Sequence, residues 1–428
     1  MAIFPQTEHL LELSKVFPLV DLSATTAGTD PSSVYEELRE KWGNVAPVQM
    51  EDGVPAWLVQ GHEEFATVAR NEQAFSRDTK YWRQHQEDRL PKDAAIRAYA
   101  PPKKPASSFH HDGENRARLR RPLDDALEAL PDTAVKERTA QVCQDLIDNL
   151  NHEGSMDLVG GYAGQVGFLS MASLFGFDRD TALQMREESA TIMEKYGPEA
   201  EAARTRMGKI LAGHVASRQA EAEVDLTSMF VNHPSFRDED GELKIREVAD
   251  SMTVPLIASA EFLTAWIALT LRLVLTDRTF SGRWRGGRID TDAALDEVLW
   301  RDTPVPNSCL PRFATQDMVL GGVQIREGDA LVLAMAGANR DPAVFTGDLE
   351  IGNRSHLAWG AGPHACPARK QARLITRTAV ERIRRELTLT LEFPDDEVEW
   401  AQTPWVRHPK ALYVRYRREN TRGIWPTQ

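Results

Sequence analysis

The stretch that decides the fold reads His-Leu-Ala-Trp-Gly-Ala-Gly-Pro-His-Ala-Cys over residues 356–366, and a predicted helix to residue 387 follows it directly. Gly360 and Gly362 permit a tight loop whose backbone can pass close to a flat ligand. Cys366 then stands at a helix N-terminus, where the dipole and the free N–H groups favour a thiolate. A lone buried cysteine is more often a small core residue. The surrounding loop is therefore what favours a ligand site.

The composition bounds the class of protein. The 428 residues are 42% hydrophobic and 27% charged, which is typical of a globular chain. Lys and Arg total 51 and Asp and Glu total 64, so the net charge of −13 argues against nucleic-acid binding. Three cysteines, Cys143, Cys309 and Cys366, fit a reducing cytosol and no disulfide scaffold, and they exclude a four-thiolate zinc site. We expect a cytoplasmic protein.

One apolar stretch approaches the length of a membrane span. It covers residues 252–275, but it contains Pro255, Ser259, Glu261 and Arg272. A helix buried on all sides in a soluble protein explains this mixture better than a spanning helix does. The N-terminal residues also lack the pattern of a secretory signal. We therefore expect no membrane association.

The rest of the chain predicts a mainly helical protein with small β-sheets. No linker, repeat or low-complexity tract divides it, so we expect an N-terminal extension over 1–31 and one domain over 32–428. The segments 77–111 and 276–291 lack helical periodicity and are predicted to be loops. Apolar periodicity and turn residues predict helices over 32–42, 61–71, 114–130, 132–150, 156–175, 179–196, 199–222, 245–276, 292–300 and 366–387. Short strands are predicted over 46–50, 56–60, 312–336, 389–393 and 411–416.

The segment 356–366 resembles the haem-binding signature of the cytochromes P450, in which an aromatic-Gly-x-Gly-x-His-x-Cys run supplies the axial thiolate. The resemblance covers residue 32 to the end and is to bacterial members of the actinobacterial type. It implies the P450 fold, with haem b held between the long buried helix and the cysteine-bearing helix. It also implies that Cys366 binds the iron and that Trp359 and Gly360 contact the haem.

Four basic residues inherit a contact to the haem propionates from this resemblance. The strand beginning Arg-Phe-Ala-Thr at Arg312 is similar to the family's Arg-x-Ala-Thr strand, and His364 matches a second contact. The family's His-x-x-x-Arg helix is represented by Arg116 and Arg120, with arginine in place of histidine. Residues four apart share a helix face, so both guanidiniums can reach one pair of carboxylates. A solvated basic face is the alternative.

The family's Glu-x-x-Arg helix is altered. Glu297 falls in place, but Trp300 stands where the arginine is expected, and Arg301 comes one residue late. One residue turns a helix by about 100°, so Arg301 cannot occupy that site. The chain resembles the minority of actinobacterial P450s that carry a Glu-x-x-Trp form. We expect Trp300 to fill the site by packing and by an indole N–H bond.

The distal helix is altered as well. The family pattern Ala-Gly-x-Glu/Asp-Thr reads Ala258-Ser-Ala-Glu261-Phe262 here, so the acid remains and the threonine is lost. Thr264 lies roughly 200° around the helix and should not substitute for it. We predict that Ala258 contacts the haem, and that Glu261 relays protons beside Phe262. Pro255 predicts a local kink.

Four residues are candidates for the substrate pocket: Trp82, Phe109, Phe262 and Asn307. Trp82 and Phe109 are as well explained as anchors of the loop that contains them. Asn307 either orients a substrate carbonyl or forms a turn beside Pro306.

The resemblance implies a haem-thiolate monooxygenase or oxidase that binds a small molecule. Phe262 in place of threonine suggests oxidative tailoring of a secondary metabolite, either by hydroxylation or by C–C or C–N coupling, and an aromatic cyclic dipeptide would suit coupling. A ferredoxin-type carrier would supply electrons, docking on a basic patch of Arg120, Arg121, Arg369, Lys370 and Arg373. The altered motifs leave a second hypothesis, a haem-binding signalling or accessory protein without turnover. A haem-free scaffold is the third.

Overall fold

The computed structural model describes residues 13, 16, 18–101, 103–195, 197–345 and 352–419. Most of the first 17 residues of the predicted N-terminal extension therefore lie outside the described residues. The part of the extension that is described belongs to the fold. Strand β1 (Val20–Asp21) pairs in parallel with β2 (Val45–Glu51), and the turn η3 (Leu22–Thr25) that follows buries its first and last residues.

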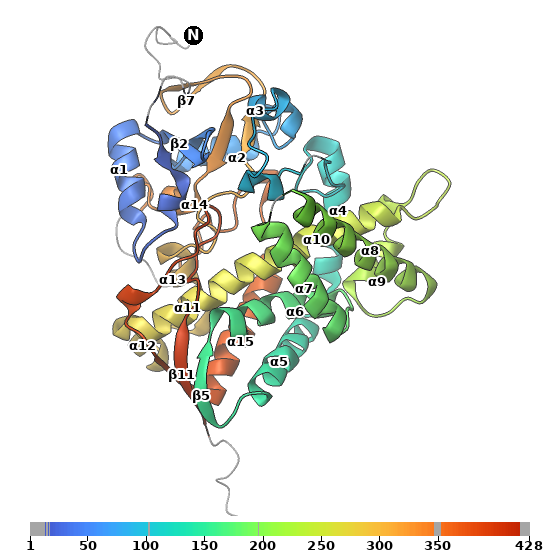
Figure 1. Cartoon of the computed structure of the whole chain (residues 1–428), viewed down its shortest axis with the longest axis vertical. Coiled ribbons are helices and arrows are strands. Elements are labelled where there is room, and N and C mark those ends of the chain that lie inside the picture. The colour runs from blue at the N-terminus through green and yellow to red at the C-terminus, as the bar shows by residue number, and fades with distance from the viewer. Residues whose placement is uncertain are drawn as a thin grey trace, which may run out of the picture.

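A six-stranded sheet in the order β1-β2-β3-β9-β6-β4 forms one end of the molecule (Figure 1). The predicted hairpin is present, because β2 pairs antiparallel with β3 (Val54–Val59) around Gly53, whose φ is 74°. Strand β9 (Ala330–Leu333) pairs with β3 in parallel and with β6 (Arg312–Ala314) antiparallel, and β4 (Phe75–Ser76) closes the sheet. Helices α1 (Ser32–Trp42), α2 (His62–Arg70) and α14 (Met335–Asn339) lie beside it.

The predicted loop over 77–111 is mostly irregular in the structure. It contains only the short helices η4 (Thr79–Tyr81), α3 (Arg83–Gln86) and η5 (Ala95–Ala98) within its described part. It runs from the end of the sheet to the start of α4 (Gly113–Ala129), so it spans the space between the sheet and the helices.

The helices fill the other end of the molecule, where one large apolar core joins them (Figure 1). The long helix predicted over 245–276 runs through it as α10 (Ile245–Ala258), a π-helical turn η8 (Ser259–Leu263) and α11 (Thr264–Thr276). Every residue from Thr264 to Val274 is buried. Among the described residues this is the one helix apolar and long enough to span a membrane, and its burial matches the expected core helix. The other helices are α5 (Asp132–Asp148), α6 (Gly164–Leu174), α7 (Arg179–Glu194), α8 (Pro198–Ala220), α9 (Leu226–Asn232), η7 (Pro234–Phe236), α13 (Thr291–Arg301) and α15 (Arg369–Glu386).

Two smaller sheets complete the fold. Strand β11 (Tyr413–Arg418) lies between β10 (Leu387–Leu391) and β5 (Glu153–Asp157), antiparallel to both, and β7 (Met318–Leu320) pairs with β8 (Val323–Ile325). The prediction of a helix from residue 156 was wrong at its start. Strand β5 ends at Asp157, a π-helical turn η6 (Val159–Ala163) follows, and only then does α6 begin.

The segment 276–291 was predicted as a loop and contains α12 (Arg278–Arg285) instead. The Asp277 side chain caps this helix by accepting the N–H of Phe280 at 2.9 Å. Phe280 and Trp284 are four residues apart, both are buried, and their rings meet edge to face at 5.9 Å. The Arg/Gly-rich sequence contains only this one apolar pair at helical spacing, which is why no helical periodicity was detected.

Candidate functional site: the cysteine loop and the distal helix

Two glycines shape the loop before Cys366. Gly360 and Gly362 have φ of 66° and 67°, in the left-handed region that favours glycine. A side chain at Gly362 would also collide with the backbone carbonyl of Ala69 on α2. The N–H of Cys366 donates to the carbonyl of Trp359 at 2.9 Å, which closes the loop. The backbone therefore fixes where the cysteine stands.

The thiol of Cys366 is free and half-buried. Helix α15 begins at Arg369, three residues later than predicted, so the helix terminus acts on the sulfur from farther away. Burial raises the pKa of the Cys366 thiol, and the Ala368 N–H and the Arg120 and Arg369 guanidiniums oppose this only in part. Within the chain alone, the helix terminus and the nearby arginines do not outweigh the effect of burial on this thiol pKa.

Three of the predicted cofactor contacts meet on two carboxylates. Arg116 Nε lies 3.0 Å from Glu72 Oε1, and His364 Nε2 lies 2.9 Å from the same oxygen. His364 Nε2 also lies 3.3 Å from Asp112 Oδ1, and Arg312 Nη1 lies 3.6 Å from that oxygen. The structure thus gathers side chains from α4, β6 and the cysteine loop into one partly buried cluster.

Arg120 makes two hydrogen bonds within the chain. Its Nη2 donates to the carbonyl of Ala365 at 2.9 Å, and its Nε donates to Asp124 at 2.7 Å. It therefore ties α4 to the residue before Cys366. The contact of Arg116 and Arg120 with the haem propionates stays a prediction.

Arg77 joins the cluster, and the sequence reasoning missed it. It follows β4, whose Ser76 pairs with Phe313, so the antiparallel register brings Arg77 close to Arg312. Its guanidinium lies over the ring of Phe109, 4.7 Å from the centroid. Burial and the charge of Arg312 lower the pKa of Arg77 to about 9. Only the pairing register could have revealed this residue, and the local sequence does not encode it.

The cluster fits a ligand that carries two carboxylates. Burial and the charge of Arg77 lower the pKa of His364 to about 4, so three arginines face only Glu72 and Asp112. Among the described residues, Arg77 Nε and Arg312 Nε and Nη1 are buried without a hydrogen-bond acceptor. Buried cationic donors need an anion. Haem propionates beside Cys366 satisfy this donor set, whereas a metal ion on Glu72, Asp112 and His364 would add charge to a cluster already cationic.

The distal helix opens into a π-helical turn where the altered motif lies. Carbonyl groups and N–H groups are displaced there from the regular helical pattern, an arrangement frequent at functional sites. Gly167 of α6 packs against this turn so closely that a side chain there would press on the carbonyl of Ser259. The hydroxyl of Thr264 bonds to the carbonyl of Ala260, so it does not replace the missing threonine. The π-helical turn begins four residues after Pro255, and Pro255 itself lies within α10.

Ala258, Glu261 and Phe262 line one end of a cavity of about 1060 Å³. Burial, with a smaller contribution from Glu194, raises the pKa of Glu261 to about 7. The Glu261 carboxyl therefore carries a proton over much of the neutral range. Phe109 also lines this cavity, as predicted for a substrate contact.

Trp82 and Asn307 do not line this cavity, so their contact with a substrate stays a prediction and their alternative structural roles fit the geometry better. Trp82 is fully buried and stacks on Phe313 with ring centroids 5.0 Å apart, so it anchors its loop. The Asn307 amide accepts from the hydroxyl of Tyr35 at 3.1 Å and donates to Thr25 Oγ1 at 2.8 Å. It also donates to the carbonyl of Pro404 at 2.8 Å. All of its polar atoms serve the fold.

Trp300 makes both kinds of contact expected of it, ring packing and an indole N–H bond. Its indole N–H donates to the carbonyl of Asn353 at 2.9 Å. Its ring stacks on Phe345 at 6.2 Å and meets His356 edge to face at 5.7 Å. The tryptophan therefore binds the segment that leads into the cysteine loop.

Asp296 of α13, next to the Glu297 of the altered motif, makes the ion pairs that join this helix to its neighbours. Asp296 is buried, pairs with Arg373 of α15, and lies 3.0 Å from Arg354 Nε and 3.6 Å from His356 Nε2. Although burial raises its pKa, bonds from His356 and Arg373 lower the pKa of Asp296 overall. Glu297 pairs instead with Arg283 and Arg301. The carboxylate that joins α13 to α15 and to the segment before the cysteine loop therefore lies one residue before Glu297.

The predicted basic docking patch is largely neutralised. Four of its five cations pair with carboxylates, namely Arg120 with Asp124, Arg121 with Asp125, Lys370 with Asp132, and Arg373 with Asp292 and Asp296. Only Arg369 has no carboxylate partner among the described residues. The patch therefore offers little net charge to an acidic carrier.

No family model matches the chain. A solved cytochrome P450 enzyme for C–S bond formation in chuangxinmycin biosynthesis superposes with a TM-score of 0.79 at 22% identity, covering 93% of this chain and 97% of that one. The chain has the cytochrome P450 fold. In sequence it is 28% identical over 408 residues to 6-deoxyerythronolide B hydroxylase of Saccharopolyspora erythraea, covering 92% of this chain and 98% of the relative. It is 26% identical over 417 residues to the cytochrome P450 monooxygenase PikC of Streptomyces venezuelae, covering 95% and 96%.

These relatives agree with the predicted enzyme class. They are P450 monooxygenases and hydroxylases of actinobacteria, and this P450-fold chain is an enzyme of that type. The predicted fold class is confirmed. The Glu-x-x-Trp form, the haem contacts and the substrate are properties of this chain that the comparisons do not address.

Proposed function

We propose that the chain is a cytoplasmic haem-thiolate oxidoreductase that tailors a small secondary metabolite oxidatively. The observation that carries the proposal is the free Cys366 in its glycine loop, beside buried arginines whose N–H groups lack acceptors. In this proposal Cys366 binds the iron of haem b, and Arg77, Arg116, Arg312 and His364 hold its propionates. Bound in this way, the thiolate-ligated haem supplies the oxidising power.

The chain's own residues control the proton and the substrate. Glu261 holds a proton at its carboxyl near neutral pH and faces the cavity, so it is the group that delivers a proton. Phe262 adds a ring where a hydroxyl would bind water, and the hydroxyl of Thr264 is held by the helix. The proton path through this turn is therefore restricted to Glu261, ordered water and the substrate itself.

A restricted proton path favours reactions that end in bond formation within the substrate. We propose C–C or C–N coupling alongside plain hydroxylation, with an aromatic cyclic dipeptide as the substrate for coupling. One relative is named as a hydroxylase, and a solved P450 of the same fold is named for forming a bond, C–S, rather than for hydroxylation. Electrons come from a ferredoxin-type carrier in this proposal.

Turnover with a surrogate ferredoxin and reductase tests the proposal. Aromatic cyclic dipeptides and polyketides are screened by product mass, which separates loss of two hydrogens from gain of one oxygen. Consumption of NAD(P)H with product formation is the expected result. Carbon monoxide binding without turnover on any substrate would favour the accessory-protein alternative. A severalfold gain in productive turnover for Phe262→Thr would show that Phe262 is not adapted to the reaction.

A further inference from the structure

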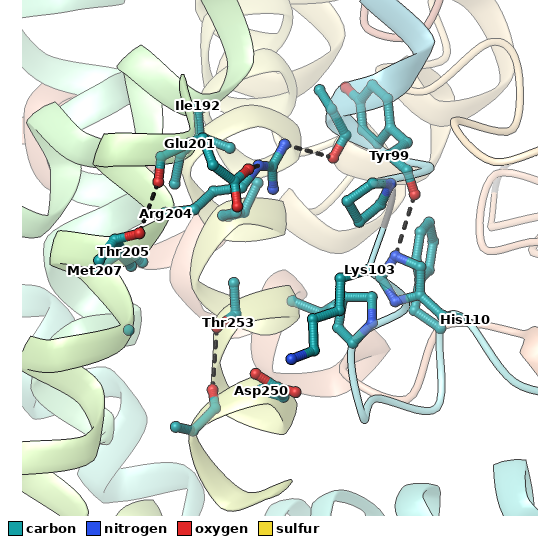
Figure 2. A pocket seen from close by; sticks show the side chains of 18 of the residues that line it. Tyr99, Lys103, His110, Ile192, Glu201, Arg204, Thr205, Met207, Asp250 and Thr253 are labelled. Atoms are coloured by element: carbon teal, nitrogen blue, oxygen red, sulfur yellow. Dashed lines mark hydrogen bonds and ion pairs between the residues drawn. The ribbon is translucent and has the colours of Figure 1, made fainter. Parts of the chain in front are cut away.

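The half-buried polar side chains that line the large cavity are nearly all bonded within the chain. In the loop over 98–110, His110 donates from Nε2 to the carbonyl of Tyr99 at 3.1 Å (Figure 2). On α10, the hydroxyl of Thr253 donates to the carbonyl of Ala249 at 3.0 Å (Figure 2). These groups hold the wall of the cavity together and are not left to meet a ligand.

The half-buried charged groups of the wall are also held, with one exception. Lys104 pairs with Asp78 at 2.8 Å. Asp250 accepts an N–H of the same loop at 2.9 Å, and Arg204 of α8 donates to one of its carbonyls at 3.2 Å (Figure 2). The exception is Glu261, whose carboxyl forms no hydrogen bond or ion pair with any described residue. The other charged side chains of the wall are exposed to solvent.

The hydroxyl of Tyr99 is the second polar group that the wall leaves to a ligand. Among the described residues its one partner is the thiol of Cys309. The ring of Tyr99 packs against the same apolar cluster as Phe262. Burial raises the pKa of the Tyr99 hydroxyl, and the charges of Cys309 and Glu261 act in the same direction, so both lie close to it. The two polar groups therefore face the cavity near the altered distal turn.

Cys309 decides which part of the Tyr99 hydroxyl meets a ligand. Burial raises the pKa of the Cys309 thiol to about 12, against the opposing charge of Arg77, so the sulfur keeps its proton. The bond between the two residues raises the pKa of Tyr99 and lowers that of Cys309, which is the effect of a hydroxyl that donates to sulfur. A hydroxyl has one hydrogen and two lone pairs. With its hydrogen on the sulfur, the Tyr99 oxygen is left as an acceptor.

The two groups together match a secondary amide. The Glu261 carboxyl holds a proton near neutral pH and can donate it to a carbonyl, while the Tyr99 oxygen can accept an N–H. An amide buried without such partners would lose affinity. A cyclic dipeptide carries two secondary amides and no charged ends that need counter-ions. Phe109 and Phe262 line the same cavity and offer rings to its aromatic side chains.

We infer that Tyr99 is a specificity-determining residue, whose hydroxyl oxygen accepts an amide N–H of a cyclic dipeptide while the Glu261 carboxyl donates to an amide carbonyl. Cys309 is a positioning residue that keeps the Tyr99 hydroxyl turned as an acceptor. This inference rests on the proposed function for the class of substrate. It adds the groups by which the cavity selects an amide that carries its hydrogen.

Equilibrium dialysis of the haem-loaded full-length chain tests the inference without requiring turnover. The ligands are cyclo(Phe-Phe) and its N,N′-dimethyl derivative, which lacks both amide hydrogens. Dialysis is run at about pH 6, below the Glu261 pKa of about 7, so that the carboxyl keeps its proton. The test variants are Tyr99→Phe, Cys309→Ala and Cys309→Ser.

The matched control is Tyr162→Phe. Tyr162 is a buried tyrosine outside the cavity wall that likewise bonds to a cysteine, Cys143, and its hydroxyl donates to the carbonyl of Ala379 at 2.8 Å. It therefore loses an equivalent hydroxyl at a place that no ligand of the cavity touches.

The wild type should bind cyclo(Phe-Phe) more tightly than the dimethyl derivative. Tyr99→Phe leaves an amide N–H without a partner, so it should bind cyclo(Phe-Phe) about tenfold more weakly and the dimethyl derivative with less than about a twofold change. Cys309→Ser keeps an acceptor for the Tyr99 hydroxyl and should keep the preference for the N–H ligand. Cys309→Ala should reduce that preference, and Tyr162→Phe should leave both affinities unchanged.

Equal losses for the two ligands in Tyr99→Phe would show a merely structural role and overturn the inference. So would an unchanged affinity for cyclo(Phe-Phe) in that variant, the same selective loss in Tyr162→Phe, or a wild type that does not bind cyclo(Phe-Phe).

Failure of the proposed function gives a different result. A chain that does not bind haem through Cys366 lacks the thiolate signature in its ferrous–carbon monoxide spectrum, whatever dialysis reports. Selective binding of the N–H ligand through Tyr99 by such a chain would keep the recognition of the amide and remove the oxidation.

Discussion

Replacing Asp296 by asparagine removes the charge that joins three segments of the proximal side. Asp296 contacts Arg373 of α15 and both Arg354 and His356 of the stretch that leads into the cysteine loop. Asparagine keeps the size of the side chain and one carbonyl oxygen. Any loss of stability therefore reports the missing charge rather than a change in packing. The matched control is Glu297→Gln, which removes the neighbouring carboxylate, the one that falls at the family's motif position.

The structure predicts different losses in the free energy of unfolding for the two variants. The Asp296 side chain is 2% exposed, and removing one partner from a buried ion pair costs about 3–5 kcal/mol. Arg373 keeps Asp292 at 3.8 Å, and Arg354 is 61% exposed, so we expect the lower end, a loss of about 3 kcal/mol. Glu297 pairs with arginines that are 28% and 37% exposed, and its loss should cost about 0.5–1 kcal/mol.

The assay is urea unfolding of the haem-loaded protein, followed by far-ultraviolet circular dichroism and by Soret absorbance. Asp296→Asn should lower the free energy of unfolding far more than Glu297→Gln and should release haem at lower urea. Equal losses for the two variants, or a larger loss for Glu297→Gln, would refute the assignment of the ion pair to Asp296.

Three further changes follow from the same structure. Trp300→Ala should lower the free energy of unfolding by about 3 kcal/mol and weaken haem retention. Trp300→Phe keeps the ring stack but loses the bond to Asn353, so it should lower the free energy of unfolding by about 1 kcal/mol. Unchanged haem retention in Trp300→Ala would count against the packing role. Because burial raises the pKa of Glu261 from 4.5 to about 7, the folded state holds that proton more tightly than the unfolded state, so the stability it contributes is lost as pH rises from 4.5 through 7. Glu261→Gln should flatten that part of the stability profile, and an unchanged profile would place the titration elsewhere. Since the cations on the cysteine side are mostly paired, the rate of reduction by a ferredoxin should depend only weakly on salt. A steep fall in that rate between low and high ionic strength would show that unpaired positive charge guides the ferredoxin to this surface.

The sequence predicted the elements whose signals are local. Periodicity and turn residues predicted three elements directly: the helix from Ser32 to Trp42, the hairpin around Gly53 and the buried helix through Glu261. The cysteine loop was predictable for the same reason, since its glycines and its thiol lie within eleven residues. Helix α12 was missed because one buried pair, Phe280 and Trp284, supports it within a run of arginines and glycines.

The parts of the site that depend on pairing across the fold could not be predicted. Arg77 reaches Arg312 only through the register of β4 with β6. Asp296, and not Glu297, faces α15 because of how α13 is rotated about its axis in the fold. The local sequence does not distinguish the two neighbouring acids. Trp82 and Asn307 were assigned to the pocket from their order in the chain, and their burial in the core could only be seen in three dimensions.

The central claim is that the sulfur of Cys366 binds haem iron, and a ferrous–carbon monoxide difference spectrum tests it most directly. The wild type and Cys143→Ala, which alters another buried free cysteine, should both show the long-wavelength Soret band of a thiolate-ligated haem. Cys366→Ala should lose that band. Retention of the band in Cys366→Ala, or its absence from the haem-loaded wild type, would contradict the account.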